Sequence, residues 1–568
     1  MGENVQVEVG WNGERKERGM RPHDRANEML EEAESRLGRG EISRRQFIRL
    51  TTAFGVTLAA PGFLAACDVG DDAAETPTAT GSADGGEPTG SVRFLSAENF
   101  WADWDPYQAN ALSQFRLNKQ IYDYLLDFPT GDLSKPEPML ATSTEQIDER
   151  TWEFKLREGV VFHDGAAFTG EDVKASIERA SGATDVEVVH AGSWVPTTVE
   201  VVDDLTVRLK TERPFGPLFS ALFNTQIVSA ADLAGKAASL KNQPNGTGPW
   251  RLVANEPTRK VMDANMDYWA GPPRIKEMIW EFVQDPQTRL SALQAGQAQA
   301  IDRVPPEHLE IIESSDDLML ASVTGIENVN LWWRPGRFEL RDTSPEFRKA
   351  VAWSIDRAAL TENLVLGQSA VADSFVPAGA LYYEPQSPAY TFDPDQAKEL
   401  LTAAGVPDGG PEFELWVASG FLPRAEQVVQ SITDSMRQVG LKPKIITTDI
   451  AGMVDDIFSD DGTGAMYHIS WASSGDPNGA LAQLIGPGGV WSDKDKRVHS
   501  LLADGAAETD PDRRGQIYSE LQQHLWEQTP HIPLYYSDFT IGHTKKLVDL
   551  RVLPNQFETY FYPASIQE

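Results

Sequence analysis

The stretch "TWEFKLREGVVFHDG", Thr151–Gly165, contains the two signals from which the fold class follows. Apolar and polar residues alternate from Thr151 to Phe162, a pattern typical of a β-strand with one buried face. His163 to Gly165 follow as turn formers, and Asp-Gly suits a tight turn that needs a positive φ. A second alternating stretch, "DLTVRLK" at Asp204–Lys210, predicts another strand. We therefore expect β-sheet whose strands are joined by tight turns.

Helical patterns interrupt these strands. The segment "SPEFRKAVAWSIDRAALTENLV" carries apolar residues at helical spacing, with Ser344 as N-cap and Pro345 in the first helical position. Residues 393–405 begin with the same signals and end at a glycine, and residues 424–440 form a further helix that a strand follows. This alternation predicts an α/β fold with several sheets. We find no short-period repeat of the solenoid or propeller kind.

The composition is that of a folded chain without disulfides. Hydrophobic residues make up 41% and charged residues 24% of 568 residues, which is enough for a core and about three to four domain-sized units. The one cysteine, Cys67, excludes an internal disulfide and a cysteine-based metal cluster. No two of the nine histidines are three or four residues apart. We therefore expect neither a metal site nor another cofactor.

The segment before Cys67 has the order of an export signal. Arg44 and Arg45 in "SRRQF" precede an apolar stretch, and "LAAC" ends at Cys67. The first motif resembles a twin-arginine signal and the second a lipobox, in which a peptidase cuts before a cysteine that receives a lipid. The apolar stretch is shorter than a membrane-spanning helix. We expect residues 1–66 to be a signal peptide; the alternative is a buried core helix with an ordinary cysteine.

Residues 67–90 have the composition of a flexible linker between a lipid anchor at Cys67 and the folded body. The net charge of −35 lies entirely beyond Cys67, because residues 1–67 contain ten acidic and ten basic residues. A surface this acidic repels nucleic acid, so we expect no nucleic-acid partner.

Seven motifs follow one another in an order that resembles a known family. They are "PMLA" at Pro138–Ala141, "TWEFKLREGVVFHDGAAFTGEDVKASIER" at Thr151–Arg179, "GTGPW" at Gly246–Trp250, "NMDYWAGPPRI" at Asn265–Ile275, "FRKAVAWSIDRAAL" at Phe347–Leu360, "DPDQAKELLTAAG" at Asp393–Gly405 and "PHIPLYY" at Pro530–Tyr536. The chain from about 91 to 560 resembles the extracytoplasmic solute-binding protein family 5, the dipeptide, oligopeptide and nickel receptors of ATP-binding-cassette (ABC) importers.

The resemblance implies a two-lobed, periplasmic-binding-protein-like α/β fold, of type II in its large cluster C form, with mixed sheets. The chain would cross between the lobes twice. Residues 91–325 and 533–568 would build lobe one, and residues 326–532 lobe two. A solute captured between the closing lobes would pass to a permease driven by ATPase subunits, and the receptor would act as a monomer outside the cytoplasm.

In peptide-binding members, a carboxylate in a loop of lobe two pairs with the free amino group of the peptide. The matching region here is "ISWASSGDPNGAL", Ile469–Leu481, in which Asp476 is the only acid. Two alternatives stay open at this loop. Ser474 could occupy the position of that carboxylate, and Asp476 could instead form a turn before Pro477.

Tryptophans indicate a second class of solute. Flat apolar rings stack on sugar rings, and some family members carry oligosaccharides. We expect six tryptophans at or near the solute, with core packing as the alternative for each: Trp101, Trp104, Trp332, Trp333, Trp416 and Trp471.

Enzymatic function is not expected, because the chain has no GxSxG, HExxH or P-loop motif. Two alternatives remain beside an import receptor for peptides or oligosaccharides. One is an exported, lipid-anchored hydrolase with carboxylates assembled in space. The other is a sensor of the same fold, which presents its solute to a signalling receptor.

Overall fold

The computed structural model describes residues 87–97, 104–108, 112–127, 135–183, 188, 194–235, 240, 242–334, 344–366, 369–406, 410, 412–459, 461–472, 475–487, 489, 495–553 and 559–567. The predicted signal peptide with Arg44 and Arg45, the anchor Cys67, most of the linker, and the site candidates Trp101 and Ser474 lie outside these residues. All described residues belong to one compact unit of the chain. Strand β1 (Thr89–Ser96) already begins inside the stretch predicted as a linker, because Thr89 pairs with Ile275.

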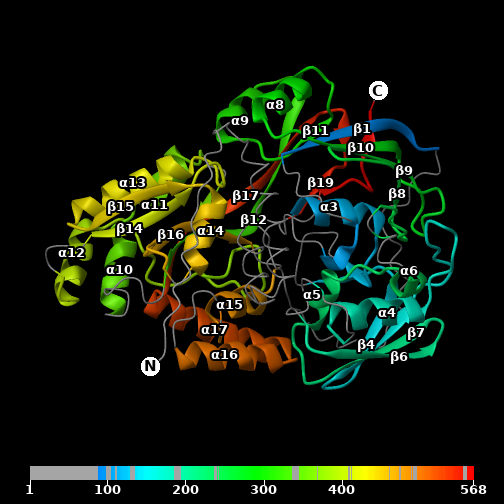
Figure 1. Cartoon of the computed structure of the whole chain (residues 1–568), viewed down its shortest axis with the longest axis horizontal. Coiled ribbons are helices and arrows are strands. Elements are labelled where there is room, and N and C mark those ends of the chain that lie inside the picture. The colour runs from blue at the N-terminus through cyan, green and yellow to red at the C-terminus, as the bar shows by residue number, and fades with distance from the viewer. Residues whose placement is uncertain are drawn as a thin grey trace, which may run out of the picture. The chain divides into compact units, whose positions relative to one another are not determined.

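A mixed sheet of eleven strands runs through the body (Figure 1). The order along the sheet is β15 (Lys442–Thr448), β14 (Glu412–Ala418), β16 (Met466–Ala472), β12 (Leu318–Trp333), β17 (His531–Thr544), β11 (Ala300–Ile301), β1, β10 (Ile275–Phe282), β9 (Arg259–Ala264) and β8 (Trp250–Glu256), with β13 (Ser369–Val371) beside β17. Parallel pairs join β1 to β10 and β11, and β14 to β15 and β16, whereas the remaining pairs are antiparallel.

Strands β12 and β17 are the longest of this sheet and lie side by side in Figure 1. Their antiparallel ladder extends from the pair Leu318–Thr544 to the pair Trp332–His531. It is interrupted twice: Thr324 opposes Asp538 whereas Glu327 opposes Ser537, and Val329 opposes Tyr535 whereas Asn330 opposes Pro533. Gly325 and Ile326 are therefore extra residues on β12, in the middle of the ladder.

The opening motif contributes β5 (Thr151–Leu156) to a second, antiparallel sheet. The order of this sheet is β4 (Ala141–Asp148), β5, β7 (Thr206–Thr211) and β6 (Thr197–Asp203). The strand predicted to reach Phe162 ends at Leu156, because Gly159 takes a φ of 77° and turns the chain. The tight turn at Asp164-Gly165 is confirmed, with a φ of 89° at Gly165. Helix α4 (Gly170–Ala180) packs against β6 and β7.

The predicted helix starts are confirmed by their caps. Ser344 accepts the N–H of Phe347 at the start of α10 (Pro345–Trp353), and Asp393 accepts two N–H groups at the start of α12 (Pro394–Ala403). The helix expected to continue from Ser344 past Leu360 is instead two helices. Asp356 caps the second, α11 (Arg357–Asn363), by accepting the N–H of Ala359.

The other helices and short strands complete the body. They are η1 (Pro106–Gln108), α3 (Leu112–Ile121), α5 (Leu218–Phe223), α6 (Ala230–Gly235), α8 (Pro286–Gln294), α9 (Pro306–Glu313), α13 (Ala425–Gln438), α14 (Ile450–Phe458), α15 (Pro477–Ile485), α16 (Lys496–Ala507), α17 (Pro511–Gln528), β2 (Leu126–Asp127), β3 (Glu137–Pro138), β18 (Leu547–Val548), β19 (Arg551–Val552), β20 (Thr559–Tyr560) and β21 (Ser565–Ile566). Across the described ranges, we see no helix with both the length and the apolar character needed to span a membrane.

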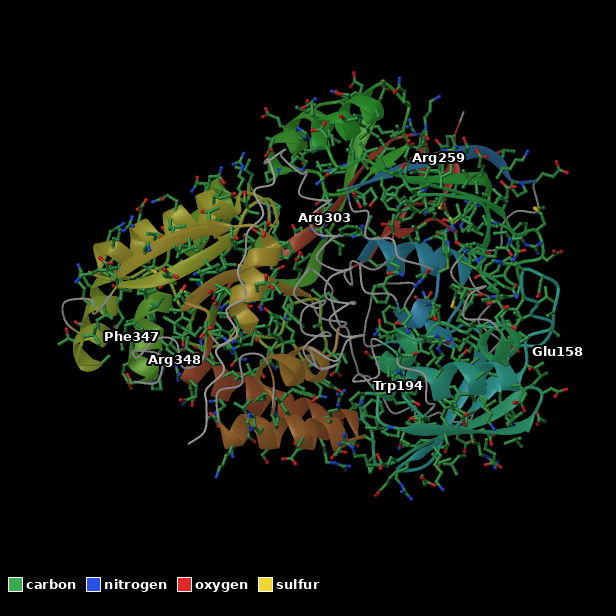
Figure 2. The ribbon with its side chains drawn as sticks, viewed as in Figure 1. Glu158, Trp194, Arg259, Arg303, Phe347 and Arg348 are labelled. Atoms are coloured by element: carbon green, nitrogen blue, oxygen red, sulfur yellow. The ribbon has the colours of Figure 1, made fainter. Side chains whose placement is uncertain are left out.

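Buried apolar side chains form two large clusters. The first core draws mainly on residues before Ile326 and on the C-terminal residues from Phe539, and the second core on residues between Val329 and Tyr535. Figure 2 shows Trp194 in the part built around the first core, and Phe347 on α10 in the part built around the second core. The exact lobe limits, 91–325 with 533–568 and 326–532, remain a prediction.

Two of the sequence motifs meet at one buried carboxylate of the first core. Asp123 accepts hydrogen bonds from Thr247 Oγ1 of "GTGPW" at 3.0 Å, and from Tyr268 Oη and Trp269 Nε1 of "NMDYW" at 3.2 and 2.9 Å. In addition, a Cβ atom on Gly246 would overlap the carbonyl oxygen of Ile121. These contacts give both motifs a structural task in the core.

Asp123 makes stability depend on pH. Burial raises the pKa of Asp123 from 3.8 to about 6, although its three hydrogen-bond donors oppose that rise. The folded state therefore takes up this proton more readily than the unfolded state. The protonated carboxyl group of Asp123 therefore contributes its full stabilisation below pH 4, and this contribution is lost as the pH rises through 6.

Between pH 4 and pH 8, we expect the free energy of unfolding of the wild type to fall by about 3 kcal/mol more than that of Asp123→Asn. This difference corresponds to the raised pKa of Asp123, which the variant lacks. Urea unfolding at several pH values measures this difference. The control is Asp267→Asn, which removes an exposed carboxylate of the same motif and should leave the pH profile unchanged. Identical profiles for the wild type and Asp123→Asn would contradict the assignment.

Candidate functional site

Three strands of the second core bring polar side chains to one face of the large sheet. Asn328 on β12 pairs with Trp471 on β16, and Trp332 on β12 pairs with His531 on β17. Directly paired residues point to the same face, as do residues two apart on one strand, so Asn330 joins them. The alternation of β12 therefore sends Asn328, Asn330 and Trp332 to one side of the sheet.

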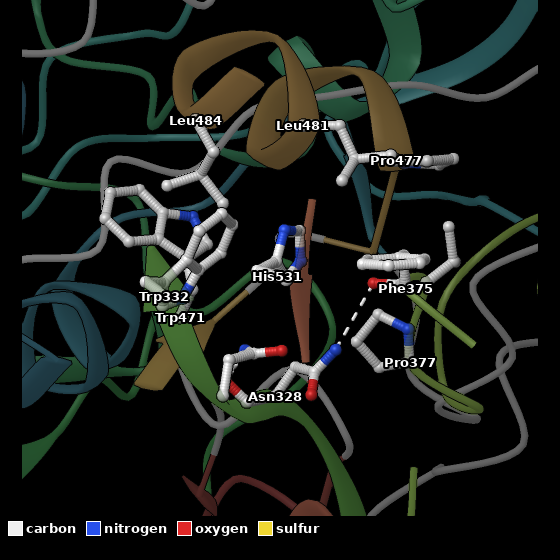
Figure 3. A pocket seen from close by; sticks show the side chains of 11 residues that line it. Asn328, Trp332, Phe375, Pro377, Trp471, Pro477, Leu481, Leu484 and His531 are labelled. Carbon is white, nitrogen blue, oxygen red and sulfur yellow. Dashed lines mark hydrogen bonds between the residues drawn. The ribbon is translucent and has the colours of Figure 1, made fainter. Parts of the chain in front are cut away.

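This face lines a small cavity, which we call the niche (Figure 3). In the figure, helix α15 with Leu481 and Leu484 covers it from above, and Phe375 and Pro377 lie to its right. The lining residues are Asn328, Asn330, Trp332, Phe375, Val376, Pro377, Trp471, Pro477, Leu481, Leu484 and His531. The cavity has a volume of about 20 Å³, which is room for about one water molecule.

Aromatic rings form the floor of the niche. The rings of Trp332 and His531 stack with their centroids 3.5 Å apart, and the ring of Phe375 meets His531 edge to face at 4.4 Å. Burial lowers the pKa of His531 well below its usual value. His531 is therefore neutral at physiological pH. None of the described residues that line the niche carries a charge.

Four buried polar atoms of the niche have no hydrogen-bond partner within the part of the chain that the structure describes. They are Oδ1 of Asn328, Oδ1 of Asn330, Nε1 of Trp471 and Nδ1 of His531. An unsatisfied buried polar group costs about 1–3 kcal/mol, and such groups are rare in folded proteins. Their concentration around one cavity makes the niche a candidate site for a polar group of a ligand.

The amide groups of the two asparagines are oriented by the backbone. Asn328 Nδ2 donates to the carbonyl oxygen of Phe375 at 3.3 Å, and Asn330 Nδ2 donates to the carbonyl oxygen of Asn328 at 2.7 Å. A carbonyl only accepts, so each of these contacts must use the amide nitrogen. Both Oδ1 atoms are therefore left as acceptors.

Asp476 does not line the niche but fixes the helix that covers it. Its carboxylate accepts the N–H of Asn478 and caps α15, whose first residue, Pro477, lines the niche. It also forms a two-pronged ion pair with Arg514 on α17, at 2.6 and 3.0 Å, and both side chains are 0% exposed. The role of Asp476 as partner of a peptide amino group, one expectation from the sequence, does not fit these contacts. The negative charge of the carboxylate is already balanced by the guanidinium of Arg514.

Both charges of this pair persist at neutral pH. Burial raises the pKa of Asp476 to about 6, and Arg514 opposes that rise, so the carboxyl group is ionised at pH 7. Burial disfavours the charge on Arg514, but the nearby Asp476 outweighs this effect and raises the pKa of the guanidinium. The remaining Arg514 donors reach the Gly505 carbonyl and Tyr518 Oη.

The structure separates the six tryptophans predicted near the solute. Trp332 and Trp471 line the niche, whereas Trp333 points to the opposite face of β12 and packs on Phe347 in the second core. Trp416 on β14 is half-buried and donates to Glu414 at 3.0 Å. Trp104 is fully buried in the first core, and Trp101 lies outside the described residues. Core packing, the alternative in each case, thus describes Trp104 and Trp333.

Three site residues, Asn328, Asn330 and His531, were not anticipated. The available signal was the pair of amides at alternate positions of the apolar stretch "NVNLWW", because amides inside such a strand need a buried partner. Within the described ranges, no group of three or more His, Cys, Asp or Glu side chains is arranged to hold a metal ion.

We expect Asp476→Leu and Arg514→Met each to lower the free energy of unfolding by about 3–5 kcal/mol, because each leaves a buried charge without its partner. The double variant should recover most of that loss. Denaturant unfolding of all four proteins measures the coupling. As a control, the same cycle on the exposed pair Arg251–Asp267 should give less than about 1 kcal/mol. Additive losses at Asp476 and Arg514 would contradict the buried pair.

The sequence is similar to those of known proteins over most of the chain. Residues 135–492 match the family of bacterial extracellular solute-binding proteins, family 5. The glutathione-binding protein GsiB of Escherichia coli O6:K15:H31 is 29% identical over 475 residues, which cover 79% of this chain and 90% of GsiB.

Solved structures share the fold at lower identity. The ABC transporter substrate-binding protein CtaP of Listeria monocytogenes superposes with a TM-score of 0.77 at 18% identity, over 85% of this chain and all of CtaP. The periplasmic binding protein DppA of Helicobacter pylori, in complex with the peptide STSA, gives 0.70 at 21% identity, over 84% of this chain and 98% of DppA. The fold is thus the two-lobed α/β fold of periplasmic binding proteins, with a mixed sheet, and the chain belongs to family 5 of the bacterial extracellular solute-binding proteins.

Proposed function

We propose that the protein is the extracytoplasmic receptor of an ABC importer and captures a peptide-like solute between its two lobes. The observation that carries the proposal is the relationship to a glutathione-binding protein, a receptor for a small peptide, over 90% of that protein's length. The polar niche supports the proposal, because two of the strands that line it, β12 and β17, also connect the two cores.

The mechanism is a shift between open and closed lobes. A solute that contacts both lobes binds the closed arrangement more tightly, and it favours that arrangement by its differential affinity for the two states. Strands β12 and β17 both run from the first core into the second, so a rotation of the lobes bends this pair. No step of the cycle requires covalent chemistry. The permease then recognises the closed, loaded receptor.

We further propose that the mature receptor is a monomer on the outer face of the cell membrane, tethered by a lipid on Cys67 after twin-arginine export. Support comes from the order of the motifs at Arg44, Arg45 and Cys67, and from the absence of aromatic residues between Cys67 and Gly90. Treated as a flexible coil, this linker spans about 25–30 Å, which holds the body just off the membrane surface.

The solute class can be tested by calorimetry. We expect glutathione or short peptides to bind the Cys67→Ser protein with a dissociation constant in the micromolar range or tighter, and small-angle scattering to show compaction on binding. The panel also contains oligosaccharides of two to four hexoses. Binding of these sugars and of no peptide would overturn the peptide assignment but keep the receptor function. Hydrolysis of any compound during titration would favour an exported enzyme.

The anchor is tested by cell fractionation. We expect the wild-type protein to sediment with membranes and the Cys67→Ser protein to be released. The reason is that the apolar stretch before residue 67 is too short to hold the unlipidated protein in the bilayer. Arg44→Lys combined with Arg45→Lys should retain the precursor inside the cell. Membrane attachment of the Cys67→Ser protein would contradict the lipid anchor. Export of the double lysine variant would contradict the twin-arginine route.

A further inference from the structure

The niche itself limits which part of a solute it accepts. Its two asparagine Oδ1 atoms are acceptors, because the Nδ2 atoms already donate to the backbone carbonyls of Phe375 and Asn328. Trp471 Nε1 can only donate, and Nδ1 of a neutral His531 either donates or accepts according to its tautomer. The set is therefore complementary to a group that both donates and accepts hydrogen bonds.

A charged group in the niche is energetically unfavourable. Phe375, Leu481 and Leu484 give it apolar walls, and Asn328, Asn330 and His531 are each more than nine-tenths buried. A charge in such surroundings needs an opposite charge beside it. Asp476 directly precedes Pro477 of the niche, but its carboxylate is already paired with Arg514. A carboxylate of the solute would in addition face the two acceptor oxygens of Asn328 and Asn330.

The size of the niche limits the group further. A volume of about 20 Å³ holds about one water-sized group. A hydroxyl group, or the tip of a carboxamide, satisfies both the volume and the mixture of donors and acceptors. An aliphatic tip would fit the volume but would leave all four polar atoms unsatisfied.

We propose that the niche binds one uncharged hydrogen-bonding group of the solute, a hydroxyl or a carboxamide tip, and that lobe two selects against ammonium and carboxylate groups at this position. This inference rests on the proposed function, because the bound group belongs to the solute that the receptor captures. It goes beyond the family relationship, since it follows from the amides of Asn328 and Asn330 and the indole of Trp471 in this chain.

The test compares tripeptides that differ only at one side chain. Alanine tripeptides carry Gln, Glu, Lys or norleucine at each position in turn, and competition calorimetry ranks them on the Cys67→Ser protein. At one position we expect Gln to bind at least tenfold more tightly than Glu, Lys and norleucine. Equal affinities for Gln and its charged counterparts at every position would overturn the proposal while leaving a peptide receptor in place.

Two variants assign that preference to the niche. Asn330→Asp should shift the preference at that position from Gln to Lys by tenfold or more, because it places a negative charge in the niche. The matched control, Asn363→Asp, makes the same change at an exposed position of α11 and should keep the wild-type ranking. Trp471→Phe, which keeps an aromatic ring and removes the N–H, should weaken the Gln peptide about tenfold and the norleucine peptide not at all. An unaltered ranking in both niche variants would overturn the proposal.

A crystal structure separates failure of this inference from failure of the peptide function. If no tripeptide binds, the peptide assignment fails, and the density in the niche of the protein purified from its host decides the inference. An oxygen or nitrogen atom within hydrogen-bond distance of Asn328 Oδ1 and Trp471 Nε1 supports it. A dry niche, or a charged group bound there, overturns it.

Discussion

The antiparallel ladder between β12 and β17 is the constraint on which the rest of the structure depends. It pairs residues from Leu318–Thr544 to Trp332–His531 and so runs from the first core into the second. Both strands are buried along their second-core halves, where residues of both faces pack on neighbouring elements. The same ladder therefore sets the relation between the cores and the register that gathers Asn328, Asn330, Trp332 and His531 on one face.

Buried polar groups in this protein fall into two kinds with different partners. Asp123 is held by three neutral donors, and Asp476 by a full countercharge on Arg514. Each fixes a piece of backbone: the first joins the "GTGPW" and "NMDYW" segments, and the second joins α15 to α17. The polar atoms of the niche differ from both kinds, because their partners are missing from the described chain. That contrast separates the two carboxylates, which have a structural task, from the polar atoms for which we propose a solute partner.

The sequence carried most of the fold and little of the site. Local signals such as the caps at Ser344 and Asp393 and the turn at Gly165 were predicted correctly, because they depend on neighbouring residues alone. The break between α10 and α11 was missed although Asp356 is itself a capping residue, since the helical spacing continues across it. The strand at Thr151 was drawn too long because alternation persists past Gly159, where the backbone turns.

The site depends on contacts between distant segments, which spacing along the chain does not show. Asp476 is a plausible ammonium ligand by position, but its partner Arg514 lies 38 residues away on another helix. Trp332 and Trp333 are adjacent and have opposite roles, because a strand sends neighbours to opposite faces. Only the pairing of β12 with β16 and β17 tells which of the two lines the niche.

The bulge at Gly325 and Ile326 has a mechanical consequence. A two-stranded ribbon resists bending wherever its ladder is continuous, and it yields first where paired hydrogen bonds are interrupted. Here the first interruption lies at the passage between the cores, one residue short of the pair Asn328–Tyr536, and the second lies between Val329 and Asn330. The two interruptions therefore flank Asn328, the first residue of β12 that lines the niche. A bend of the ladder at either interruption displaces Asn328 relative to Trp332, so bending between the cores and the shape of the niche are coupled.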